Sequence, residues 1–383
     1  MSAGTEPLKF RDVALGRRLL EGLQQATAEI GRSGTTVMHV CGSHEQAMGR
    51  FGLRAGFPAA LDVVMGPGCP VCITDGPEVD EAVALAMQGV RVTTYGDMLR
   101  VPGTGWSLDD ARAHGAKVDV VYGIAQAVEI ARASPEPVVF FATGFETTAV
   151  ATAAMVRRGL PPNLSILSAH KYIPPAMEVV ASMPDTKVEG YLAAGHAATI
   201  TGYRIFEPFA ARHRVPVVVT GFEPLDILAG LTRVVTMIRD GEHGVVNAFP
   251  RCVTAEGNEN ALATLWEVFE PAGGQWRGIA SVDEGNLVLR SRFHGVDARR
   301  RFDIDREQLR TEPVAGRALA ERCRCGPIMA GRSLPTDCAL YGRECTPSTP
   351  VGACMVSTEG MCRIWSEYGG RPELSVGASK AAS

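Results

Sequence analysis

Short apolar runs rich in β-branched residues alternate with helical segments between about residues 35 and 250. The runs are TTVMHV, LDVVM, VRVTTYG, KVDVVYG, PVVFFATGFE, LSILSAH, VEGYLAAGH and VPVVVTGFE. Near-continuous apolar strands that alternate with helices are typical of parallel sheets covered by helices on both faces. The pattern therefore predicts an α/β fold, and the length of 383 residues predicts two or three domains rather than one core.

Composition argues against several classes of protein. Hydrophobic residues make up 46% of the chain and charged residues 21%, which is typical of a soluble globular protein. No apolar run reaches the roughly 20 residues that span a bilayer, and the start MSAGTEPLKF lacks the layout of a secretory signal. A net charge of -4 without clustered Lys and Arg gives no electrostatic basis for nucleic-acid binding. We therefore expect a cytoplasmic protein that binds neither membrane nor nucleic acid.

Ten cysteines are the main chemical signal in the chain. Because cytosolic thiols are kept reduced, a disulfide framework is not expected, and metal or redox chemistry becomes the leading interpretation. Cys41, Cys69 and Cys72 lie early, Cys252 stands alone, and the other six fall between positions 323 and 362. We expect Cys252 to be a small buried apolar residue.

The three early cysteines follow predicted strands. In open α/β sheets ligands bind beyond the carboxyl ends of the strands, so Cys41 and the GPGCPVC loop are expected to share a cleft. A helix that begins at Gly42 or Ser43 would favour a Cys41 thiolate through its dipole and free N–H groups. His44, in the sequence CGSHE, is placed to face the same site.

The CPVC pair has three candidate roles besides that of two buried thiols. Thioredoxin-like exchange is one, although Pro77 predicts a helix that begins several residues after the pair rather than at it. A zinc site made with Cys41 and His44 is the second, and iron, which the same soft ligands suit, is the third. The spacing alone does not separate zinc from iron.

The C-terminal tail is more specific. From Cys323 it reads CRCGPIMAGRSLPTDCALYGRECTPSTPVGACMVSTEGMC, with six cysteines among Pro and Gly. Four thiolates can hold an iron–sulfur cluster, and two would remain as a redox pair. Zinc ribbons carry two Cys-x2-Cys knuckles and the tail has none, so the pattern favours a cluster over zinc or purely structural thiols.

Other features are weaker. TGFE occurs at 143–146 and again at 220–223, each time after a Val-rich strand, which hints at related βα units. Polar residues at predicted strand ends are candidates for acid–base or supporting roles, and each is as consistent with a structural one. They are Asp97, Glu146, His170 and His196. No phosphate-loop or GxGxxG motif is present, so nucleotide binding has no motif behind it.

With these motifs in view, the chain resembles the HypD family of hydrogenase maturation factors. CGSHE, GPGCPVC, YGDMLRVPG, TGFETT, SAHKYIPPAM and the tail ending GACMVSTEGMC follow the order of the family. The resemblance implies a scaffold for assembling the iron centre of nickel–iron hydrogenases, in which iron carries two cyanides and one carbon monoxide. It implies HypC as a partner in the complex, HypE and HypF as the source of cyanide, and the hydrogenase large subunit as an indirect partner.

Carried onto this sequence, the resemblance implies roles for nine of the cysteines. The nascent iron is expected at Cys41, Cys69 and Cys72, with His44 nearby and a further thiolate from HypC. A 4Fe–4S cluster is expected on Cys323, Cys338, Cys345 and Cys362, and Cys325 with Cys354 as the adjacent redox-active pair. The choice between Cys323 and Cys325 stays open because both belong to one Cys-x-Cys.

The family fold implies two α/β domains with a cleft between them, plus a loop-rich C-terminal iron–sulfur domain. Approximate boundaries are 1–125, 126–275 and 276–383, with the chain free to cross between domains. Electrons are hypothesised to pass from the cluster and its neighbouring dithiol to the iron site. The main alternative is an enzyme, a cluster-dependent thiol–disulfide oxidoreductase that uses the CPVC dithiol, and a zinc-stabilised binding protein is the third interpretation.

Overall fold

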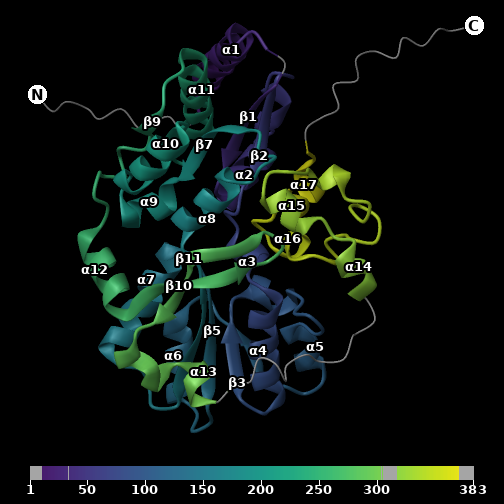
Figure 1. The fold of residues 1–383 in the computed structure, drawn as a ribbon. Helices are drawn as coiled ribbons and strands as arrows, with labels where there is room; N and C mark the ends of the chain where they lie inside the picture. The colour runs from purple at the N-terminus through teal and green to yellow at the C-terminus, as the bar shows by residue number, and fades with distance from the viewer. Residues whose placement is uncertain (1–10, 33, 303, 305–316, 371–383) are drawn as a thin grey trace, which may run out of the picture.

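Two parallel β-sheets form the framework of the molecule (Figure 1). The computed structural model describes residues 11–32, 34–302, 304 and 317–370. Within both sheets every strand pairs with its neighbours in parallel. The α/β class predicted from the apolar strand pattern is confirmed.

One sheet has five strands in the order β2-β1-β7-β8-β9. Its strands are β1 (Thr35–His39), β2 (Leu61–Met65), β7 (Val188–Ala194), β8 (Pro216–Thr220) and β9 (Gly244–Asn247). Helices α1 (Val13–Glu29) and α11 (Pro224–Asp240) cover one face and bury Leu23 and Leu231 against it. Strand β8 is buried along its whole length, whereas the edge strand β2 exposes Asp62.

The other sheet has four strands in the order β4-β3-β5-β6. They are β3 (Arg91–Thr94), β4 (Val118–Val120), β5 (Val138–Gly144) and β6 (Leu164–His170). Every residue of β5 and β6 is buried, which explains why their sequences are apolar without alternation.

Helices between the strands cover the two sheets. They are α2 (Gly42–Arg50), α3 (Pro70–Ile73), α4 (Gly76–Met87), α5 (Leu108–Ala113), α6 (Ile124–Arg132), α7 (Glu146–Arg158), α8 (Ile173–Ala181), α9 (Gly195–Thr201), α10 (Glu207–His213), α12 (Glu259–Val268) and α13 (Ala298–Arg301). Short 3-10 turns occupy Leu53–Gly56, Gly96–Arg100, Arg204–Phe206, Ser291–Val296 and Pro335–Asp337. None of the helices in the described parts of the chain is long and apolar enough to cross a membrane.

The two sheets do not divide the chain at residue 125. The chain builds β1 and β2 in one sheet, crosses over to build the whole four-stranded sheet, and returns for β7. A boundary at 125/126 would separate β3 from β5, which pair with each other. The apolar pattern locates strands but does not say which sheet each one joins, because pairing is decided by tertiary contacts.

An antiparallel hairpin of β10 (Phe269–Trp276) and β11 (Ala280–Leu289) packs beside the four-stranded sheet. Ser168 in β6 donates through Oγ to the carbonyl oxygen of Leu287 at 2.7 Å. Helix α13 also lies against β6. The predicted boundary at 276 therefore cuts through this hairpin, and the segment after it belongs structurally with the second sheet.

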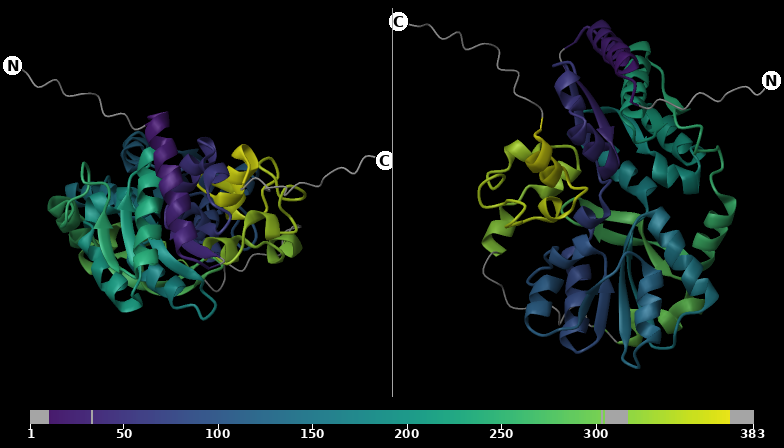
Figure 2. Two further views of the ribbon diagram at one scale, coloured as in Figure 1. Left: turned by 90° about the horizontal axis from the view of Figure 1, so that it is seen from above. Right: turned by 180° about the vertical axis from the view of Figure 1, so that it is seen from behind.

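The C-terminal region, residues 317–370, consists of loops and short helices (yellow-green in Figures 1 and 2). Its helices are α14 (Arg317–Glu321), α15 (Cys325–Met329), α16 (Ala353–Val356) and α17 (Met361–Tyr368). Helices α15 and α16 contact α3, and α17 contacts α2. Trp365 fixes this contact, since its Nε1 donates to Glu45 Oε1 at 2.8 Å in a buried site that Arg54 also enters. The loop-rich character predicted for the tail is confirmed.

Candidate functional site

Cys41 lies where β1 ends and α2 begins. It is the N-cap residue of α2 and is 7% exposed. Burial, followed by the carboxylate of Glu359, raises the pKa of its thiol to about 12, although the N–H groups of Ser43 and His44 act in the opposite direction. The predicted helix start is confirmed. Burial outweighs the helix terminus, however, so the thiol is protonated rather than a thiolate.

The GPGCPVC loop lies directly against Cys41 because β1 and β2 are neighbours in register, with His39 opposite Met65. After the strands end, Gly42 N donates to the carbonyl oxygen of Gly68 at 3.0 Å. A Cβ at Gly68 would lie 2.1 Å from the carbonyl carbon of Val40. Only glycine allows the two segments to approach this closely, and the approach places Cys69 beside the Cys41 segment.

Cys69 and Cys72 form a disulfide with a Cα–Cα distance of 5.3 Å. Both are buried, and Cys69 is the N-cap of α3, whose Cys72 N–H donates to Cys69 Sγ at 3.2 Å. Pro77 does lie in the first turn of α4, as predicted. The expectation that no helix opens at the pair is wrong, because Pro70 begins the four-residue helix α3 directly after Cys69.

His44 is buried in a stack of rings. Its ring centroid is 4.8 Å from that of Phe222, and His196 stacks on Phe222 at 3.7 Å. Neither ring nitrogen of His44 makes a hydrogen bond of normal geometry to the described residues, and burial lowers its pKa to about 3. The second TGFE stretch thus supplies Phe222 to this stack, a role that the sequence did not suggest.

A cavity of about 150 Å³ lies beside Cys41, between the carboxyl ends of strands from both sheets. Its lining is Val40, Cys41, Ser43, Gly68, Pro70, Gly144, Phe145, Thr147, Thr148, Ile173, Ala194, His196, Ala197 and Glu359. The predicted convergence of strand ends is therefore present for β1, β5 and β7. His196 lines this cavity, whereas His44 is not among its lining residues.

A polar stretch of the C-terminal region, Ser357–Glu359, reaches this site, and its Glu359 lines the cavity. Ser43 Oγ donates to Glu359 Oε1 at 3.3 Å, and burial raises the pKa of the Glu359 carboxyl. Ser357 Oγ lies 3.5 Å from Cys69 Sγ. These two residues were missed from the sequence. One sequence signal could have found them. The polar run STEG stands between two tail cysteines, and a loop could have been formed there without these polar residues.

The six tail cysteines gather in the C-terminal region. Backbone N–H groups donate to three of their sulfurs: Cys354 N to Cys325 Sγ at 3.1 Å, Cys362 N to Cys354 Sγ at 3.3 Å, and Val351 N to Cys345 Sγ at 3.4 Å. A Cβ at Gly352 would lie 2.6 Å from Cys323 Sγ. The contact with Cys325, followed by burial, raises the pKa of the Cys323 thiol. The predicted pair Cys325 and Cys354 is brought together.

The number and arrangement of the tail thiols indicate which metal group they could hold. Among the described residues, no three or more His, Cys, Asp or Glu side chains are arranged to hold a metal ion. A four-iron cluster takes one thiolate on each iron, so its ligands surround a group rather than a point. Six thiols, three of which accept N–H hydrogen bonds at sulfur, suit such a cluster. At the CPVC pair, the disulfide itself prevents both sulfurs from acting as thiolate ligands.

The other polar residues predicted at strand ends differ in how near they lie to the cysteines. Asp97 accepts a hydrogen bond from Ser357 Oγ, the same oxygen that lies 3.5 Å from Cys69 Sγ. Glu146 is buried at the start of α7, and its Oε1 accepts from Ile173 N at 3.0 Å. His170 instead bonds through Nε2 to Thr152 Oγ1 at 3.0 Å, away from the cysteines.

Cys252 contradicts its prediction. It is exposed rather than buried. The residue follows Arg251 in a turn after β9, where no strand or helix pattern was available to place it.

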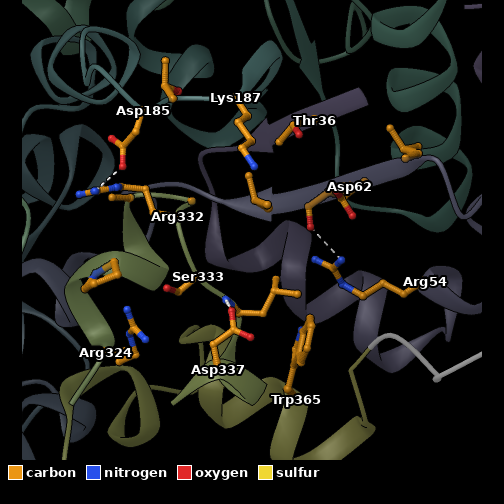
Figure 3. A pocket seen from close by; sticks show the side chains of 18 of the residues that line it. Thr36, Arg54, Asp62, Asp185, Lys187, Arg324, Arg332, Ser333, Asp337 and Trp365 are labelled. Atoms are coloured by element: carbon orange, nitrogen blue, oxygen red, sulfur yellow. Dashed lines mark hydrogen bonds and ion pairs between the residues drawn. The ribbon is translucent and has the colours of Figure 1, made fainter. Parts of the chain in front are cut away.

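A larger cavity of about 480 Å³ lies where β2 meets the C-terminal region (Figure 3). Asp185 pairs with Arg332 across one wall, and the Lys187 side chain points into the open space. No cysteine lines this cavity. The cavity lies at the interface between the first sheet and the C-terminal region and is separate from the cysteine sites.

Comparison with known proteins assigns the chain to a family. The family model HypD, described as the hydrogenase formation hypA family, matches residues 14–369. The chain belongs to the HypD family. A hydrogenase maturation factor HypD of Rhizobium leguminosarum bv. viciae is 40% identical over 375 residues, covering 94% of this chain and 94% of that protein. The resemblance inferred from CGSHE, GPGCPVC and the tail is thereby confirmed.

Further HypD-family relatives match over similar lengths. A hydrogenase maturation factor HypD of Cupriavidus necator is 38% identical over 94% of this chain and 96% of that protein. A hydrogenase expression/formation protein HupD of Azotobacter chroococcum is 38% identical over 96% of this chain and 98% of that protein. The protein is thus a hydrogenase maturation factor of the HypD family.

Proposed function

We propose that this HypD-family protein is the scaffold on which the iron centre of nickel–iron hydrogenase is assembled, in complex with a HypC-type chaperone. The iron is cargo and carries two cyanides and one carbon monoxide. The observation that supports the proposal is the contact between the Cys41 segment and the CPVC loop beside a small buried cavity. Three soft sulfur ligands from two strand ends can grip iron and leave positions open for diatomic ligands.

The sulfur groups must change state before they bind the cargo. The Cys69–Cys72 disulfide must take up two electrons and two protons to become two thiols. Metal ligands must be deprotonated, so iron binding would displace a proton from Cys41, whose pKa burial raises to about 12. The same burial would shield the bound iron from water and oxygen.

A resident 4Fe–4S cluster is assigned to the tail thiols Cys323, Cys338, Cys345 and Cys362, with Cys325 and Cys354 as the neighbouring redox pair. When bound, such a cluster supplies electrons one at a time. The chain's own contribution is to position the pair. Helix α15 begins with Cys325 and α16 contains Cys354, and both helices contact α3, which contains Cys72. The dithiol thus lies on the side from which the CPVC disulfide would be reduced.

The partners follow from the same role. The HypC-type chaperone would dock at the rim formed by the Cys41 segment and the GPGCPVC loop and add a further thiolate. Cyanide would arrive from HypE and HypF, and the finished centre would pass towards the hydrogenase large subunit. The cytoplasm, where these partners are expected, is the proposed compartment.

An infrared spectrum of the anaerobically purified protein, co-expressed with its HypC-type partner, tests the scaffold proposal. Bands of metal-bound cyanide and carbon monoxide are expected in the wild type. They should disappear in Cys41→Ala together with a single iron, while the visible absorption of the cluster stays. The matched control is Cys252→Ala, an exposed cysteine far from both groups in the chain, which should leave the bands unchanged.

A second candidate function is favoured by the buried CPVC disulfide. It is a cluster-dependent thiol–disulfide oxidoreductase with the Cys69–Cys72 pair facing a partner disulfide. A wild-type protein that is brown but shows no cyanide or carbon monoxide bands would contradict the scaffold and favour this candidate. The oxidoreductase would also turn over a partner disulfide and lose this activity in Cys69→Ala.

A further inference from the structure

Ser357 lies between two groups that compete for its single hydroxyl proton. Its Oγ is 3.2 Å from Asp97 Oδ2 and 3.5 Å from Cys69 Sγ. Glu359 N donates to the same oxygen at 3.1 Å, so this oxygen already acts as an acceptor on one side. A serine hydroxyl has one proton, and it can serve only one of the other two neighbours at a time.

Asp97 does not depend on Ser357 alone. Its Oδ2 also accepts from the N–H and the Oγ1 hydroxyl of Thr358, each at 3.0 Å. If the Ser357 proton turned away, the carboxylate would still keep two hydrogen bonds. Ser357 is fully buried, so water does not compete for the hydroxyl. The two orientations of the hydroxyl therefore differ in which partner receives its one hydrogen bond, and the Asp97 carboxylate keeps two hydrogen bonds in either case.

The C-terminal region holds Ser357 rigidly in this position. Ser357 N donates to the carbonyl oxygen of Ala353 in α16, and Gly360 N donates back to the Ser357 carbonyl oxygen, both at 3.0 Å. A Cβ at Gly360 would lie 2.1 Å from the carbonyl oxygen of Cys354. The hydroxyl that touches Cys69 is thus fixed by the same turn that separates two tail cysteines.

We propose that Ser357 is a positioning residue for Cys69. When the Cys69–Cys72 disulfide is reduced, the Ser357 hydroxyl turns from Asp97 to the Cys69 sulfur. In this reaction the S–S bond takes up two electrons and two protons and yields two thiols. A disulfide sulfur is a weaker acceptor than a thiol or thiolate sulfur, so the new hydrogen bond stabilises the reduced form. The inference rests on the scaffold proposal, in which the reduced pair receives the iron, and it names the residue that tunes how readily that form appears.

The test is the reduction potential of this one cysteine pair. The anaerobic full-length protein is equilibrated with defined ratios of reduced and oxidised dithiothreitol, a dithiol that supplies the electrons and protons and closes to its own disulfide. Free thiols are then alkylated, and the peptide that contains both Cys69 and Cys72 is quantified by mass spectrometry. This readout needs no bound cargo iron.

The two neighbours of Ser357 predict shifts of opposite sign. Ser357→Ala removes the donor to sulfur, so the equilibrium constant for reduction should fall about tenfold, which corresponds to about 30 mV for a two-electron couple. Asp97→Asn removes the competing charged acceptor and frees the hydroxyl for Cys69, so the constant should rise. Ser357→Thr keeps the hydroxyl and should restore the wild-type value.

A matched control is Ser348→Ala, an exposed serine of the same region whose hydroxyl bonds to Thr346. It should leave the potential unchanged. The inference is overturned if Ser357→Ala equals the wild type, or if Asp97→Asn shifts the potential in the same direction. If Ser357→Ala does not fold, the upward shift in Asp97→Asn decides alone. If Ser357→Ala and Asp97→Asn shift the potential in opposite directions, but the wild type shows no cyanide bands, the role of Ser357 is supported and the scaffold proposal is contradicted.

Discussion

The two groups of cysteines are brought together by different physical means. Cys41 and the CPVC pair follow β1 and β2, which are neighbouring parallel strands, so the sheet register places them side by side. The six tail cysteines lie in short helices and loops, and N–H donors to sulfur are prominent among their contacts. The first group is therefore positioned by the apolar core of a sheet. We propose that the second also depends on the cluster that its sulfurs would hold.

The largest expected effect comes from removing a tail thiol. Cys338→Ser should abolish the visible absorption of the cluster and make the C-terminal region sensitive to protease. Binding free energy at such a site is folding free energy, so the local loss of stability should exceed about 5 kcal/mol. Far-UV circular dichroism should show both sheets still folded. If the C-terminal region of Cys338→Ser resisted protease while the cluster absorption was lost, the tail cysteines would not depend on a cluster for their arrangement.

A substitution in the sheet-positioned group should act through packing instead. Gly68→Ala places a Cβ 2.1 Å from the Val40 backbone, so the strand ends must separate. We expect a loss of more than about 3 kcal/mol in urea unfolding and the loss of the infrared bands, with the cluster absorption retained. Gly123→Ala, where a Cβ meets nothing within 4 Å, is the control and should change stability by less than about 1 kcal/mol.

The smallest expected effect on stability concerns Glu146, beside the cavity wall that the second sheet provides. Glu146 is buried, and burial raises its pKa to about 7 from an ordinary 4.5. Between these values the folded state binds a proton that the unfolded state does not, so stability is greatest below pH 4.5, falls as the pH rises to about 7, and is level above. Glu146→Gln should remove this fall and be more stable than the wild type at pH 8 by up to about 3 kcal/mol.

The control for that measurement is the same residue of the other TGFE stretch. Glu223 is 36% exposed and pairs with Arg11. Glu223→Gln should shift stability by less than about 1 kcal/mol and leave the pH profile unchanged. Equal pH profiles for wild type and Glu146→Gln would show that burial does not raise the pKa of the Glu146 carboxyl.

Most of the fold was predictable because parallel strands buried on both faces are mostly apolar, without alternation. VVFFATG and LSILSAH could be assigned to strands on that basis, and both are fully buried. The helix start after Cys41 was predictable for a similar local reason. The division of strands between sheets was not, because β3 and β5 carry no sequence mark of the partner they choose.

Parts of the site were also beyond sequence reasoning. Two identical TGFE stretches end in one buried and one partly exposed glutamate, and only the second Phe enters a stack with His44. The four residues are the same in both, so the tetrapeptide alone does not decide the difference; the flanking residues and the tertiary surroundings do. Ser357 and Glu359 were missed for the same reason, since the partners that place them at the site, Asp97, Cys69 and Ser43, are 260 or more positions away along the chain.

The sequence by itself determined the α/β class, the family, and which cysteines are candidates for metal binding or electron exchange, because these depend on residue type and local spacing. The tertiary structure decided which of those groups meet and in what state. Burial keeps the Cys41 thiol protonated, the approach at Gly68 joins two strand ends, and a turn of the C-terminal region places a hydroxyl against Cys69. Desolvation and long-range contacts act only after the chain has folded, so no local pattern encodes them.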